Sequence, residues 1–345
     1  MEQKGSLTRE GWLARFAAAR AALMDADRVL AVRERLAAHG SDEALLLGDQ
    51  LAVASARRVG VFAGSFNPQT VAHAAVAEAA RVARRLDGVI WAMARVTVDK
   101  EQVARATLAD RVVQLEAYCR ATGSDGVAVL NAGLYADQAE AVRRLVGAES
   151  EIWLIVGFDK IEQIFDARYY RDRDAALERL FASAGLLVAP RAGRDATDLA
   201  ELLAVPGNAR FAERVNYVPV SLDMAGIAST AGRLRLRDTP EDGAFEALGG
   251  VLTPEGAALG AATDAYRAAE RLASGTRIDR YELRHVWLDA LEALPADERR
   301  MLSLGRLVAR AASDDERGRA LRGWLEADRS VAPLEEVRRV VASDI

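Results

Sequence analysis

The fold of this chain is decided by residues 58–73, whose sequence is RVGVFAGSFNPQTVAH. The run 59–63 is apolar apart from one glycine and too short for a helix, which is typical of a central strand in a parallel sheet. Gly64 begins a tight turn, and from Thr70 the sequence is alanine-rich and helical. The stretch therefore predicts a strand, a turn and a helix whose N-terminus, with His73 on its first turn, faces a bound phosphate.

Strand and helix patterns alternate from this stretch onward. A βαβ rhythm of this kind predicts an α/β fold with a doubly wound parallel sheet. The expected strands are Val59–Ala63, Gly88–Ala94, Val127–Leu130, Glu151–Val156, Gly185–Ala189 and Val215–Val218. Ligands of such sheets bind at the carboxyl ends of the strands.

The chain divides into three parts by its patterns. Residues 1–55 have apolar positions at helical spacing and predict a helical N-terminal extension, and residues 56–240 carry the sheet. Turn-forming residues follow Arg237, and residues 241–345 then show only helical periodicity. We expect this all-helical C-terminal region to fold against the ligand site without completing it.

The composition limits which binding partners and which cellular compartment are expected for this chain. The net charge of −5 gives no electrostatic reason for binding nucleic acid or an anionic membrane. The single cysteine, Cys119, excludes an internal disulfide and suits a reducing compartment. No run of about 18 apolar residues indicates a membrane span, so a cytoplasmic protein is expected. No Cys/His spacing typical of a metal site is present.

Two motifs give the chain a family resemblance. GSFNPQTVAH, residues 64–73, resembles the GxFxPxTxxH form of the (H/T)xxH motif in the nucleotidyltransferase superfamily, specifically the nicotinamide or nicotinate mononucleotide adenylyltransferases. IASTAGR, residues 227–233, resembles the ISSTxxR signature of the same domain. The resemblance covers residues 57–237 and implies a Rossmann-like nucleotidyltransferase domain.

The resemblance also implies a reaction and its residues. A mononucleotide 5′-phosphate would attack the α-phosphorus of ATP and release pyrophosphate, with Mg²⁺ held mainly by phosphate oxygens and water and by no protein ligand. The implied catalytic residues are His73, Lys100 and Arg233. The implied ATP-binding residues are Gly64, Ser65, Phe66, Thr70, Gly157, Asp159, Ser229 and Thr230. The implied acceptor-binding residues include Arg111 and Arg191, and Tyr135, Tyr169 and Tyr170 are the nearest candidates for an aromatic platform, with Tyr135 and Tyr169 taken as acceptor-binding.

Several alternatives stay open at this point. Lys100 and Arg111 could be solvated charges, and Asp159 could be a helix N-cap. Family members stack an aromatic residue, commonly tryptophan, on the pyridine ring, but no tryptophan lies between Trp91 and Trp153 here. The acceptor could therefore be another phosphorylated small molecule, and the donor ATP or CTP. A non-catalytic nucleotide-binding module whose helical C-terminal region mediates homo-oligomer assembly is the alternative outside enzymes.

Overall fold

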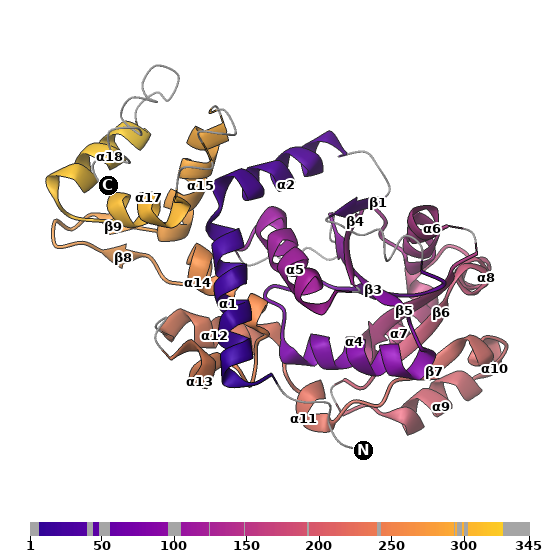
Figure 1. Cartoon of the computed structure of the whole chain (residues 1–345). Helices are drawn as coiled ribbons and strands as arrows, with labels where there is room; N and C mark the ends of the chain where they lie inside the picture. Colours follow the sequence, from indigo (N-terminus) through magenta and orange to yellow (C-terminus); the bar gives the residue numbers. More distant parts are fainter. Residues whose placement is uncertain are drawn as a thin grey trace.

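The computed structural model describes most of the chain (Figure 1). The described residues are 7–39, 44–47, 56–95, 105–123, 125–147, 149–191, 193–239, 243–292, 294, 299 and 303–326. Within them no helix is long and apolar enough to cross a membrane.

The described part of the chain forms a seven-stranded sheet in the order β1-β4-β3-β2-β5-β6-β7. Its strands are β1 (Ala44–Leu47), β2 (Arg58–Ala63), β3 (Gly88–Ala94), β4 (Gly126–Leu130), β5 (Glu151–Gly157), β6 (Gly185–Ala189) and β7 (Val215–Tyr217). All neighbours pair in parallel except β1, which runs antiparallel to β4. The chain winds from β2 through β3 to β4 on one side and from β5 through β6 to β7 on the other, which confirms the doubly wound α/β fold. The crevice of such a sheet lies where β2 and β5 end.

Helices cover both faces of the sheet (Figure 1). Helices of the sheet region and the N-terminal extension are α1 (Arg9–Met24), α2 (Ala26–Ala38), α4 (Val71–Arg84), α5 (Leu108–Thr122), α6 (Tyr135–Val146), α7 (Phe158–Phe165), α8 (Arg173–Ser183), α9 (Ala196–Ala204), α10 (Pro206–Ala209), α11 (Leu222–Ala225) and α12 (Ser229–Asp238). Alternate strand residues divide between two cores: Phe62 packs with α1, α4 and α5, whereas Val59 and Val61 pack with α6, α7 and α8. This alternation is the period of two that a strand imposes on its side chains.

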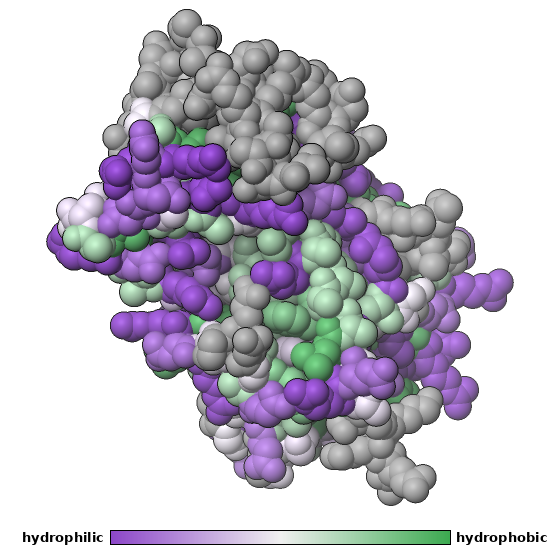
Figure 2. All heavy atoms as spheres, turned by 60° about the vertical axis from the view of Figure 1, so that its left-hand side comes forward, coloured by the Kyte–Doolittle hydropathy of each residue, from purple (hydrophilic) through white to green (hydrophobic). Residues whose placement is uncertain are grey.

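The C-terminal region contains α13 (Ala244–Leu248), α14 (Pro254–Thr263), α15 (Arg280–Glu292), α17 (Leu304–Ala311) and α18 (Glu316–Glu326). It also contains a short antiparallel pair, β8 (Glu270–Arg271) and β9 (Arg277–Ile278), so the region is not purely helical. Figure 2 shows hydrophobic residues gathered in the middle of the face that this region helps to form, with hydrophilic residues around them.

The N-terminal extension differs from its prediction at residues 44–47, which form strand β1 and not a helix. Leu45 and Leu47 are buried against the sheet edge. A four-residue apolar run is too short to show the periodicity of a helix or of a strand. Only its pairing with β4 therefore identifies it as a strand.

The three predicted parts share one hydrophobic core. Trp12 and Phe16 of the extension, Trp91 of β3 and Trp287 of α15 belong to the same buried cluster. The division into parts at residues 55 and 240 stays a prediction about the chain's organisation, but these parts are packed together and do not stand as separate bodies.

Candidate active site

The first turn of α4 is held by a reciprocal pair of hydrogen bonds between Thr70 and His73. The His73 backbone N–H donates to Thr70 Oγ1 at 3.3 Å, and the Thr70 backbone N–H donates to His73 Nδ1 at 3.0 Å. Because Nδ1 accepts a hydrogen bond here, the hydrogen of a neutral imidazole lies on Nε2. The predicted helix and its histidine are confirmed in position, and the imidazole has one donor left for a ligand.

The environment of His73 keeps its ring neutral. Burial, and then the positive charge of Arg191, lower the pKa of His73 from 6.5 to about 4. Phe62 and Phe66 contact the ring edge to face at centroid distances of 5.9 and 5.2 Å. At neutral pH the ring therefore offers a hydrogen-bond donor that carries no charge.

The turn between β2 and α4 has a tight backbone. Phe66 has a φ of 45°, in the left-handed region that a bulky residue rarely adopts, and its ring is buried between Phe62 and Trp91. A Cβ on Gly64 would lie 2.8 Å from the Phe66 ring, so only glycine fits beside it. Gly64 and Phe66 of the motif therefore determine the conformation of the turn.

Helix α5 holds this turn through hydrogen bonds to its backbone carbonyls. Arg111 is only 7% exposed, and its Nη1 donates to the Ser65 carbonyl at 2.8 Å. Gln114 Nε2 donates to the Phe66 carbonyl at 3.3 Å, and its Oε1 accepts from the Gln69 backbone N–H. Arg111 is therefore not a solvated charge, and its contacts hold the turn in place.

The second motif reaches the same turn from α12. Ser229 Oγ donates to the Pro68 carbonyl at 2.8 Å, and Arg233 Nη1 donates to the Asn67 carbonyl at 2.8 Å. Arg233 Nη2 also donates to Thr230 Oγ1 at 2.9 Å. Helix α12 has no side-chain cap, so its first N–H groups are free of a capping acceptor and suit an anion. Two motifs more than 150 residues apart thus meet at the end of β2.

The ends of β5 and β6 bring together a second group of candidates. Asp159, in the first turn of α7, lies 3.9 Å from Arg191 Nε, and both side chains are about half exposed. No side chain caps α7, so Asp159 does not act as its N-cap. A Cβ on Gly157 would lie 2.7 Å from Asp159 Oδ1, so the glycine gives the carboxylate room.

The two tyrosine candidates differ in their surroundings. Burial, and then the negative charge of Asp159, raise the pKa of Tyr135, which places this ring near the Asp159 group. Tyr169 is 53% exposed on the turn Ala167–Tyr169, beyond the far end of α7. Among the described residues no hydrogen bond or ring contact joins Tyr169 to another candidate. Lys100 lies outside the described residues.

The C-terminal region contributes contacts that sequence reasoning missed. The Tyr266 hydroxyl donates to Asn67 Oδ1 at 2.5 Å. Thr253 Oγ1 donates to Gln69 Oε1 at 3.0 Å, and Thr70 forms an isolated antiparallel bridge with Leu252. The Thr-Pro-Glu signal at 253–255 predicts a helix start, but no local pattern shows that this helix packs behind the turn.

The comparisons with known proteins agree with these motifs. The family described as cytidylyltransferase-like matches residues 61–235. A probable nicotinate-nucleotide adenylyltransferase of Laribacter hongkongensis (strain HLHK9) is 31% identical over 192 residues, which are 52% of this chain and 83% of that relative.

Solved structures of Plasmodium falciparum nicotinic acid mononucleotide adenylyltransferase, one complexed with NaAD and one with APC, are also similar to this chain. They share 14% and 12% identity with it, with TM-scores of 0.44 and 0.40. Each comparison covers 61% of this chain and 97% of the other.

Proposed function

This chain belongs to the cytidylyltransferase-like family of nucleotidyltransferases, and from that premise we propose that it adenylylates nicotinate or nicotinamide mononucleotide. The observation that carries the proposal is the meeting of α4 and α12 at the end of β2. His73 Nε2, the uncapped N-terminus of α12 and the Arg233 guanidinium gather there around one turn. Neutral and charged donors on helix N-termini are what a triphosphate requires.

The reaction follows from in-line phosphoryl chemistry. An oxygen of the acceptor 5′-phosphate forms a bond to the α-phosphorus of ATP as the bond from that phosphorus to the β-phosphate oxygen breaks, and pyrophosphate leaves with the electron pair. Because no covalent bond to the protein forms, catalysis consists of positioning and charge stabilisation. We assign His73 Nε2 to a phosphate oxygen of the donor, and Arg233 with the α12 N-terminus to the leaving pyrophosphate.

We assign Mg²⁺ to the phosphates of ATP, with which it would arrive. In the described part of the chain, no three His, Cys, Asp or Glu side chains cluster in a way that could hold a metal ion. Mg²⁺ keeps several waters and binds through phosphates with few protein ligands in such sites. Bound with ATP, the ion would neutralise charge on the phosphate oxygens.

The acceptor is assigned to the ends of β5 and β6. The exposed half of the Arg191 guanidinium can pair with the acceptor's phosphate or carboxylate, and Tyr135 beside Asp159 is the aromatic platform. The relative from Laribacter, described as a nicotinate-nucleotide enzyme, favours nicotinate mononucleotide over the amide. The family's description as cytidylyltransferase-like is the specific reason to keep CTP as an alternative donor.

A matrix of substrates tests the proposal. The full chain with Mg²⁺ receives ATP or CTP together with nicotinate mononucleotide, nicotinamide mononucleotide or another phosphorylated acceptor, and both pyrophosphate and dinucleotide are quantified. We expect product only with ATP and a pyridine mononucleotide, with the nicotinate form faster. Turnover with CTP or another acceptor alone would overturn the assignment. Calorimetric binding of ATP without any pyrophosphate release would favour a non-catalytic module.

A further inference from the structure

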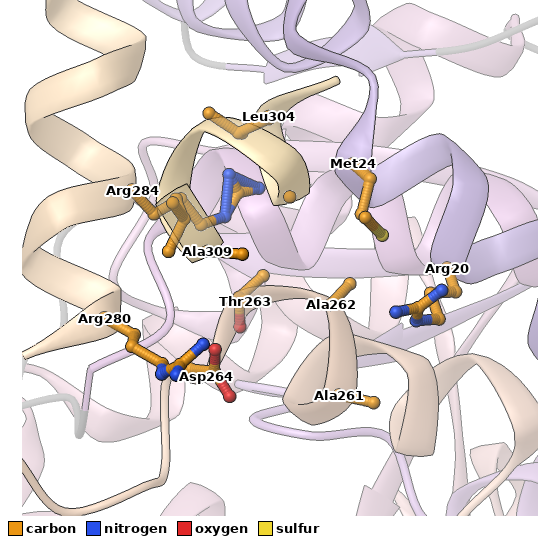
Figure 3. A pocket seen from close by; sticks show the side chains of 12 residues that line it. Arg20, Met24, Ala261, Ala262, Thr263, Asp264, Arg280, Arg284, Leu304 and Ala309 are labelled. Atoms are coloured by element: carbon orange, nitrogen blue, oxygen red, sulfur yellow. The ribbon is translucent and has the colours of Figure 1, made fainter. Parts of the chain in front are cut away.

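A cavity of about 160 Å³ lies in the C-terminal part of the molecule, away from the residues of the candidate active site. Helices α1, α14, α15 and α17 surround it, and Figure 3 shows the side chains at its wall. The accessible wall is more polar than apolar, and Met24, Ala262 and Leu304 are among its apolar residues. Three arginines, Arg20, Arg280 and Arg284, also line it.

Arg284 is the unusual residue of this wall because its side chain is only 2% exposed. Its Nη2 donates to Asp110 Oδ1 at 2.8 Å and to the Leu23 carbonyl at 2.9 Å. Its Nε and Nη1 have no hydrogen-bond acceptor among the described residues. A buried, charged N–H group that makes no hydrogen bond costs free energy. Such groups therefore need an acceptor, which is a water molecule or a ligand.

We propose that this cavity is a second ligand site, which takes a small monocarboxylate with an apolar body. The carboxylate would accept from the free N–H groups of Arg284, and the body would lie against Met24, Ala262 and Leu304. Leu304 and Gly305 open α17, so the positive end of that helix faces the same anion. This site goes beyond the proposed transfer reaction and uses none of its residues.

The charge of the wall favours a monoanion over a phosphate dianion. Arg280 Nε already pairs with Glu270 at 2.8 Å, Asp264 pairs with Arg267 at 3.1 Å, and Arg284 shares its charge with Asp110. The positive charge that these ion pairs leave unneutralised at the wall therefore suits a ligand with one negative charge. The volume is close to that of an engineered apolar cavity of about 150 Å³ that accommodates benzene.

The site connects to the transfer site through one buried carboxylate. Asp110, which holds Arg284, precedes Arg111, and Arg111 donates to the Ser65 carbonyl of the turn before α4. The Tyr281 hydroxyl also contacts Asp110 Oδ2 at 3.2 Å.

Calorimetric titration of the full chain with benzoate, against benzamide as the neutral isostere, tests the proposal. We expect benzoate to bind and benzamide to bind about tenfold more weakly or not at all, because only the anion satisfies the charged donors. A saturating non-hydrolysable ATP analogue should leave benzoate binding intact. Equal binding of the two probes, competition by the ATP analogue, or no binding of benzoate would each overturn the proposal, the last meaning that only water fills the cavity.

Cavity-filling variants locate the binding. Ala262→Leu places extra methyl groups in the cavity and should abolish benzoate binding, whereas Ala200→Leu, on the exposed face of α9, should leave it unchanged. Ala309→Leu fills the wall from an exposed position, so it tests the site even where Ala262→Leu fails to fold. Unaltered benzoate binding in a folded filling variant would place the ligand elsewhere.

Discussion

The turn between β2 and α4 has two sides that differ in chemistry. The phosphate side, made by His73, Thr230 and Arg233, consists of polar groups that are only partly covered. The support side, made by Thr253, Gly256 and Tyr266 of the C-terminal region, contacts the same turn through close packing and hydrogen bonds. Under the proposed function, the groups that bind phosphate come from α4 and α12, whereas the C-terminal region contributes contacts that hold the turn. Arg233 does both, because it also donates to the Asn67 carbonyl. Changes on the phosphate side should reduce turnover, and changes on the support side should first reduce stability.

The largest effect is expected from His73→Ala. Losing one preorganised donor to the phosphates should lower kcat by about 10²–10³-fold. The free energy of unfolding should fall by only about 1 kcal/mol, since the helix loses its capping partner. Steady-state kinetics and urea unfolding check both numbers, with His39→Ala at the end of α2 as the control histidine. An unaltered rate would remove His73 from the mechanism.

Gly256→Ala tests the support side. A Cβ on Gly256 would lie 2.0 Å from the Gln69 backbone carbonyl, which cannot move without the turn. We expect a loss of about 1–3 kcal/mol in unfolding free energy from overpacking. The matched control is Gly323→Ala in α18, where a Cβ meets open space and alanine should stabilise the helix by roughly 0.5–1 kcal/mol. If both glycines respond alike, the contact with Gln69 does not matter.

The protonation of His73 makes the phosphate side sensitive to acid. The unfolded chain takes up a proton at this residue near pH 6.5, whereas the folded chain does so only near pH 4. The stability that His73 contributes is complete above pH 6.5 and is lost as the pH falls to about 4. Because the ring is partly exposed, we expect the loss to be about 1–2 kcal/mol.

Unfolding measured at several pH values should show this extra loss in the wild type and not in His73→Gln. The His73 resonance in an NMR titration is identified by its absence from the spectrum of His73→Gln. Its chemical shift should stay constant above about pH 5. Titration of that resonance near pH 6.5 would mean that the ring is solvated and that its neutral state is not enforced.

The smallest effect is expected from Tyr266→Phe. The variant keeps the ring but removes the hydroxyl that donates to Asn67 Oδ1. Because Arg233 holds the carbonyl of the same Asn67, the turn should shift only slightly, and kcat/KM should fall by about 3–10-fold. Kinetics with varied ATP measure this change. A loss as large as that of His73→Ala would mean that the two sides are not separable.

The strands of the sheet and the position of His73 at the start of a helix were predictable from local sequence. The six strands from Val59 to Val218 were predictable because apolar runs bounded by turn residues are local signals. The place of His73 on a first helical turn was predictable because an alanine-rich helical pattern begins at Thr70, whereas the reciprocal hydrogen bonds between Thr70 and His73 are seen only in the structure. The meeting of the two motifs followed from the family resemblance and from strand order. Each of these features depends on neighbours along the chain or on a known pattern.

The support side and the cavity were not predictable from the sequence, because they depend on contacts between residues far apart along the chain. The hydrogen bond from Tyr266 to Asn67 joins residues 199 positions apart, and Arg284 meets Asp110 across 174 positions. Strand β1 likewise became visible only when it paired with β4. The physical reason is that a helical pattern encodes which of its faces is apolar but not which partner covers that face. The partner is chosen by the close packing of the whole core.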